Sequence, residues 1–264
     1  MNWRGYAVAV TVALLATSVG AREGGEPSIA QIATARQALA ARLQGAEIGA
    51  VPPLLSNPAD AALIRAAFDP RGLAQVTVAT LGEGLDSCDL GNRYSVMLGF
   101  AGSRKDEFKG TAPDVAAKAL VARQLVNAGK YQDELALSLR FTAFCMARLV
   151  EPMAAFWQGL PEGQRTQVRL DGLREARKGM TGIYLGLVMT QVDSGERPAN
   201  RALLMEALLS NNDRLAQALT PADRKRVLDA IVRYLPAATG ATRTDLIRLR
   251  DELAALPCLQ LCAL

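Results

Sequence analysis

The spacing of apolar residues in two long segments constrains the fold more than any other feature of the chain. Within residues 135–156 and 173–190, an apolar or small side chain recurs after alternating steps of three and four residues. The two sets are Leu135, Leu139, Thr142, Met146, Leu149, Met153 and Phe156, and Leu173, Ala176, Met180, Ile183, Leu187 and Thr190. This spacing is typical of helices that meet at a shallow angle in antiparallel bundles. It predicts two long, closely packed helices.

The composition supports a helical fold for the rest of the chain as well. Alanine and leucine together supply 84 of the 264 residues, and only 5% of the residues are aromatic. Half of the residues are hydrophobic, which excludes a disordered or collagen-like chain. We therefore expect an all-α protein, a multi-helix bundle or an irregular array of antiparallel helical hairpins, with about eight to nine helices.

Capping residues place the starts of several of these helices. Asn57-Pro58 and Thr220-Pro221 each combine an N-cap residue with a proline at the first helical position, and in both cases an aspartate follows three residues after the cap. Thr242 and Asp245 have the same spacing of an N-cap residue and a carboxylate. For the segment 75–81 the sequence leaves open a short strand or a weak helix. The predicted helices are 28–46, 58–68, 87–100, 113–128, 131–158, 162–193, 198–219, 221–235 and 243–256.

The N-terminus has the features of a secretory signal peptide. Arg4 is followed by 17 uncharged residues, and Val19 and Ala21 are small residues at the positions that a cleavage site requires. Residues 1–21 are therefore predicted to be cleaved, which leaves residues 22–264 as a single all-helical domain in the periplasm or outside the cell. The alternative is that the segment remains as a membrane anchor, although 17 residues are at the short limit for a membrane span. After cleavage we expect no stable membrane span.

The four cysteines, Cys88, Cys145, Cys258 and Cys262, are candidates for structural disulfides. In an oxidising compartment an even number of cysteines favours disulfide bonds, here with three possible pairings. Pairing of Cys258 with Cys262 and of Cys88 with Cys145 is slightly favoured, and a crosslink from the C-terminal pair to the rest of the protein is the main competitor. A metal or redox site at Cys258 and Cys262 is disfavoured because the chain offers no histidine as a further ligand.

The absence of histidine excludes several classes of enzyme. Ser-His-Asp and Cys-His catalysis and histidine-containing zinc and di-iron sites all need this residue. The chain also lacks a Walker loop and a nucleophile elbow, and Gly82-Glu-Gly84 fits a flexible entry to a helix better than a dinucleotide fingerprint. We predict no catalytic, cofactor-binding or metal-binding residues and no cofactor.

Carboxylates are the remaining groups that could support catalysis, through glycoside cleavage by an acidic pair. Asp86 and Asp89 flank Cys88 in a glycine-rich region, and their main expected role is to cap a helix N-terminus. Glu134 and Glu151 are expected on solvated faces of the long helix. A histidine-free glycan-active enzyme is therefore the third functional hypothesis.

Two further features suggest binding. Gly179, Gly182 and Gly186 are expected to allow close approach of another helix, and alternatively could border a cavity for an apolar ligand together with nearby methionines. Seven basic residues between Arg224 and Arg250 could form a patch for anionic groups, but a solvated face is favoured. Nucleic acid is not an expected partner because the mature charge is only about +3.

The preferred hypothesis is a non-catalytic one. We expect an exported, disulfide-stabilised helical protein that binds a protein or a cell-envelope component. A carrier of a small apolar ligand or lipid between helices is the alternative.

Overall fold

All regular secondary structure in the described part of the chain is helical. A computed structural model describes residues 26–47, 49–104, 106–192, 195–259 and 261–264, and in these residues it contains nine α-helices and no strand. The predicted all-α class is therefore confirmed, whereas the proposed signal peptide lies outside the described residues. The helices are α1 (Ile29–Gln44), α2 (Pro58–Ala67), α3 (Leu81–Phe100), α4 (Pro113–Lys130), α5 (Gln132–Gly159), α6 (Gln167–Thr190), α7 (Pro198–Leu215), α8 (Pro221–Tyr234) and α9 (Gly240–Ala255).

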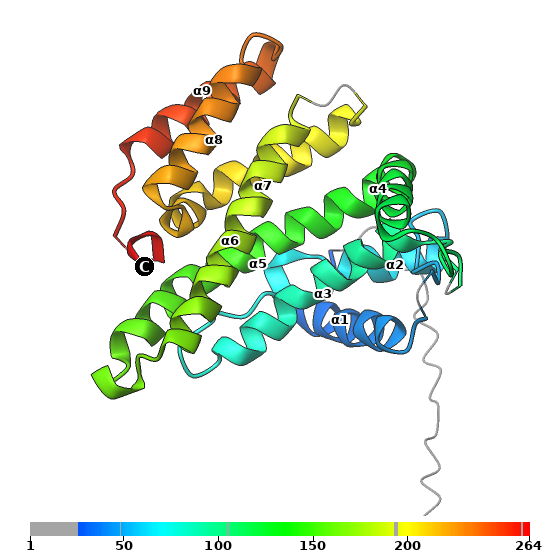
Figure 1. The fold of residues 1–264 in the computed structure, drawn as a ribbon, viewed down its shortest axis with the longest axis horizontal. Helices are drawn as coiled ribbons and strands as arrows, with labels where there is room; N and C mark the ends of the chain where they lie inside the picture. Colours follow the sequence, from blue (N-terminus) through cyan, green and yellow to red (C-terminus); the bar gives the residue numbers. More distant parts are fainter. Residues whose placement is uncertain (1–25, 48, 105, 193–194, 260) are drawn as a thin grey trace, which may run out of the picture.

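Helix α5 is the central element of the fold. It packs most extensively against α3 on one side and α7 on the other. In Figure 1, α1–α4 lie to one side of α5, and α8 and α9 lie at the opposite end of the molecule. Because α5 is covered on two sides, its buried surface is wider than the apolar stripe predicted from sequence and also includes Phe141 and Val150, which are both fully buried.

The two predicted apolar stripes are packing surfaces. Leu149 and Met153 on α5 and Met180 and Leu187 on α6 are all at most 3% exposed. Buried side chains form two clusters, one centred on α1, α2, α3 and α5 and the other on α5 through α9. Phe144 and Met146 contact both clusters, so α5 connects the two cores.

Side-chain caps begin two helices where the sequence predicted them. Asn57 Oδ1 accepts a hydrogen bond from the Ala59 amide at 3.0 Å, and Thr220 Oγ1 accepts one from the Asp223 amide at 3.1 Å. The cap predicted at Thr242 is wrong, because α9 begins at Gly240 and Thr242 lies within it. A side-chain oxygen at an N-cap satisfies an amide that has no partner inside the helix.

The start of α3 was also predicted wrongly. This helix begins at Leu81, so Gly82 and Gly84 are helical residues rather than a flexible entry, and residues 73–77 form neither a strand nor a helix. The reason is tertiary packing: a Cβ added at Gly84 would lie 2.9 Å from Val76 and 3.0 Å from Leu149. Contacts with α5 therefore outweigh the low helix propensity of glycine.

Candidate functional site

A wide groove lies between α2, α5 and α7. It has a volume of about 750 Å³ and includes residues from the linker before α2, among them Leu55 and Ser56. Charged and polar side chains from three helices line it: Arg65 from α2, Asp133 and Glu134 from α5, and Arg197 and Asn200 next to and within α7. Lys130, at the end of α4, lies at the same groove.

A buried tyrosine and a buried glutamate hold the linker that forms one wall of the groove. Tyr94 donates its hydroxyl proton to the Pro53 carbonyl at 2.7 Å, and Glu134 Oε1 accepts a hydrogen bond from the Leu55 amide at 2.9 Å. Burial, with a smaller contribution from the negative charge of Glu134, raises the pKa of Tyr94, so its hydroxyl remains a donor. Glu134 is only 7% exposed, so the predicted solvated position of this residue is wrong.

Both carboxylates of the groove are engaged in structural contacts. Glu134 binds the Leu55 amide, and Asp133 forms an ion pair with Arg197 and accepts a hydrogen bond from Asn200 Nδ2 at 3.0 Å. Asn200 also donates to Glu196 at 2.8 Å. These contacts hold α5 and α7 together along one wall of the groove.

The basic groups of the groove are less constrained. In the described part of the chain, Arg65 and Lys130 have no acidic side chain within ion-pair distance. Lys130 Nζ lies 4.9 Å from the ring centroid of Tyr131, which is a cation–π contact that leaves its hydrogen-bond donors available. The groove therefore offers cationic donors to a ligand, whereas both of its carboxylates already have internal partners.

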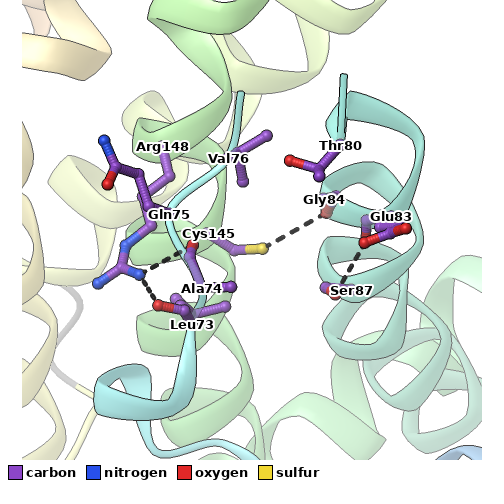
Figure 2. Close-up of a pocket in the computed structure, with 10 residues that line it drawn as sticks. All are labelled: Leu73, Ala74, Gln75, Val76, Thr80, Glu83, Gly84, Ser87, Cys145 and Arg148. Carbon is purple, nitrogen blue, oxygen red and sulfur yellow. Dashed lines mark hydrogen bonds between the residues drawn. The ribbon is translucent and has the colours of Figure 1, made fainter. Parts of the chain in front are cut away.

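A smaller cavity lies between the segment 73–76, the start of α3 and the middle of α5 (Figure 2). Its volume is about 130 Å³. Arg148 lines it and donates hydrogen bonds to the carbonyl oxygens of Leu73 and Ala74, the second at 3.2 Å. Burial, followed by the charge of Arg214, lowers the pKa of Arg148. In this cavity the charged side chain holds a loop in place.

The four cysteines form two disulfide bonds. Cys88 on α3 is joined to Cys145 on α5, and Cys258 is joined to Cys262 near the C-terminus, which is the pairing that the sequence slightly favoured. Cys88 and Cys145 are at most 2% exposed and belong to the first core cluster. The first bond connects two helices and the second closes a short loop.

The acidic residues that the sequence suggested as candidates are not brought together into a cleft. Asp86 and Asp89 lie within α3, beyond its first turn, so their predicted capping role is wrong. Asp89 instead pairs with Arg93 at 2.8 Å, one helical turn away. Glu151 is exposed and lines a cavity of about 290 Å³ with Arg148 and Arg214. This distribution gives no support to a glycosidase-like pair.

The prediction that the α6 glycines lie against another helix is wrong. A Cβ added at Gly179, Gly182 or Gly186 would meet no atom within 4 Å. Close approach occurs instead between α3 and α5, where a Cβ on Gly91 would lie 2.4 Å from Thr142 Oγ1. Neither the α6 glycines nor Met146, Met153 and Met180 line the groove, the cavity at Arg148 or the cavity at Glu151.

Most basic side chains of the C-terminal segment 224–250 have an acidic or backbone-carbonyl partner within the protein. Arg226 pairs with Asp223, Arg248 with Glu252 and Arg250 with Asp251. Arg224 donates to the backbone carbonyls of Leu256 and Ala216. Apart from Arg224 and Arg250, the seven basic side chains are exposed, in line with the solvated face that the sequence favoured.

Of the residues that line the groove, only Glu134 stood out in the sequence, because the others are far apart along the chain or carry no motif. Arg65, Lys130 and Asn200 come from three helices and belong to no motif with a fixed spacing. Among the described residues there is also no group of three or more His, Cys, Asp or Glu side chains placed to hold a metal ion. None of the described helices is both long and apolar enough to span a bilayer.

Comparisons with known proteins do not add an identity to this geometry. No protein-family model, curated protein or solved structure matches the chain.

Proposed function

We propose that the protein is exported and binds an acidic group of a protein or cell-envelope component in the groove between α2, α5 and α7, without catalysing a reaction. The observation that carries the proposal is the asymmetry of the groove: its carboxylates are occupied by structural partners, whereas Arg65 and Lys130 have no acidic partner among the described residues. Arginine and lysine bind carboxylates and phosphates through charge-assisted hydrogen bonds.

The occupied acids also argue for binding rather than catalysis. A general acid or base must reach a proton of the substrate, whereas Asp133 is held in an ion pair with Arg197 and Glu134 is only 7% exposed. Asp133 and Glu134 are both held by internal partners. The two disulfides and the signal-like N-terminus support export, because disulfide bonds persist in oxidising compartments.

Site-specific photocrosslinking in the native host tests this proposal. We expect a crosslinker at Ser56, which lines the groove, to capture a discrete partner. The double charge reversal Arg65→Glu/Lys130→Glu should reduce the yield of this crosslinked product by about tenfold or more. A crosslinker at Gly182, which is exposed on α6, is the matched control. Equal capture at both positions would argue against a role for the groove. Turnover of an envelope substrate that is lost in Asp133→Asn would show that the protein is an enzyme instead.

A further inference from the structure

Helix α4 has an unusually exposed apolar face. It lies at the edge of the molecule, where it packs against α3 and more weakly against α5, away from α8 and α9 (Figure 1). Of its 18 residues only Asn127 is buried. Four of the thirteen exposed large hydrophobic side chains of the described residues belong to this helix: Val115, Val121, Leu125 and Val126, which are 51–70% exposed.

These four side chains share one side of α4. At about 100° per residue they fall within an arc of about 140°, and Asn127 lies on the opposite side. Asn127 fixes the orientation of the helix, because its Nδ2 donates to the carbonyls of Gly99 and Ala101, each at 3.0 Å. The apolar side therefore faces away from the core, and residues 121–129 of this helix carry only one charge, Arg123, which is turned toward Glu107.

Lysine is concentrated around the same helix. Four of the six lysines of the chain lie between residues 105 and 130, and the segment 104–130 contains six basic and three acidic residues. One acid, Glu107, is paired with Arg123, and this contact lowers the pKa of Glu107 to about 2. Lys109 and Lys118 have no acidic partner within ion-pair distance in the described part of the chain. Lys118 lies beside the apolar side chains on α4, and the segment 104–130 carries a net charge of +3, so this region complements a surface that is apolar inside and anionic outside.

We infer that the outer face of α4 binds an anionic lipid bilayer surface. Val121, Leu125 and Val126 would enter the boundary between headgroups and acyl chains, and Lys118 would contact the phosphate groups. Lys109, four residues before α4, adds to the positive charge of the segment 104–130. Lys118 lies within the apolar arc, and its long methylene stem allows the ammonium group to reach the headgroups while the stem remains among apolar groups. Asp114, in the first turn, is the one acidic residue on this side of α4.

A second copy of the chain fits this face less well. An antiparallel helix pair centred on Val121 and Ala122 would place Lys118 against Leu125 or Val126 of the other copy and bury an unpaired ammonium group. A register that pairs Lys118 with Asp114 of a second copy would be centred near residue 116, which leaves Leu125 and Val126 uncovered. An anionic bilayer satisfies both the apolar residues and the lysines.

Vesicle sedimentation with the exported chain, purified from its host, tests this inference. We expect binding to vesicles of phosphatidylglycerol and phosphatidylcholine in equal parts to be at least about tenfold stronger than to phosphatidylcholine alone, and to fall at about 0.5 M salt. Leu125→Ser/Val126→Ser should reduce binding by about tenfold or more. Lys109→Glu/Lys118→Glu should abolish the preference for phosphatidylglycerol.

Two control variants show whether vesicle binding is specific to α4. Val168→Ser/Met189→Ser changes a comparably exposed apolar pair at the two ends of α6 and should leave vesicle binding unchanged. Arg65→Glu changes the groove and should also leave it unchanged, so failure of the groove proposal would not affect this result. The inference would be overturned if the protein did not bind anionic vesicles. It would also be overturned if sedimentation velocity showed a dimer that Leu125→Ser/Val126→Ser dissociates, while this variant still bound vesicles as well as Val168→Ser/Met189→Ser does.

Discussion

At the scale of single residues, arginine side chains bind backbone carbonyls at the ends of helices and in the loops that follow them. Arg36 donates to the carbonyl oxygens of Ala67, Asp69 and Gly72 at 2.6–2.9 Å, and these carbonyls belong to the end of α2 and the turn after it. Arg148 and Arg224 act in the same way on other loops. The last carbonyls of a helix carry partial negative charge, so a guanidinium group is well suited to bind them.

Replacement of Arg36 should therefore destabilise the protein strongly. Arg36→Met removes the guanidinium donor from the three carbonyls and also removes the cation–π contact of this group with Phe141, whose ring centroid lies 5.0 Å away. We expect the free energy of unfolding to fall by about 3 kcal/mol, measured by urea denaturation with the disulfides intact. Arg42→Met, which removes an exposed ion pair with Asp60, is the control and should cost less than about 1 kcal/mol. Equal effects would show that the carbonyl contacts contribute little.

At the scale of helices, glycine has a different role in α3 and in α6. A side chain at Gly91 would collide with Thr142 on α5, whereas a side chain at Gly182 would meet open space. Both glycines lie inside helices, so each lowers helix propensity by a similar amount relative to alanine. The difference between them comes from packing alone.

This pair gives a matched mutational test. Gly182→Ala should stabilise the protein by up to about 1 kcal/mol, because alanine favours the helix and no neighbour must move. Gly91→Ala should destabilise it by about 1 to 2 kcal/mol, because the new methyl group would lie 2.4 Å from Thr142 Oγ1. Thermal or urea unfolding measures both. Stabilisation by Gly91→Ala would mean that α3 and α5 are not as close as the structure places them.

The same elements show what the sequence could and could not predict. The apolar stripes of α5 and α6 and the caps at Asn57 and Thr220 depend on local spacing, so they were predictable. The start of α3 and the role of its glycines depend on contacts with α5, which is separated from α3 along the chain by the whole of α4. The groove was not predictable for the same reason, because Arg65, Lys130 and Asn200 meet only in three dimensions.

At the scale of the whole molecule, α5 is shared by both core clusters. The Cys88–Cys145 disulfide joins it to α3 in the first cluster, and Leu139, Phe144 and Met146 contact the second. A helix that contributes to two cores couples their stability, because it cannot unfold without disrupting both. We therefore expect the described helices to unfold as one cooperative unit, in line with the single domain expected from the sequence.

Removal of the interhelical disulfide tests this coupling. The bond spans a sequence separation of 57 residues, so its loss in Cys88→Ala/Cys145→Ala should reduce the free energy of unfolding by about 4 kcal/mol, because the unfolded chain gains conformational freedom. Cys258→Ala/Cys262→Ala, which opens a loop with a separation of only 4 residues, should cost about 2 kcal/mol or less. Hydrogen exchange reports where stability is lost. If α5 couples the cores, the amides of α7 and α9 in Cys88→Ala/Cys145→Ala lose protection from exchange to the same extent as those of α3. A loss of protection confined to α1–α4 would instead mean that the two clusters unfold independently.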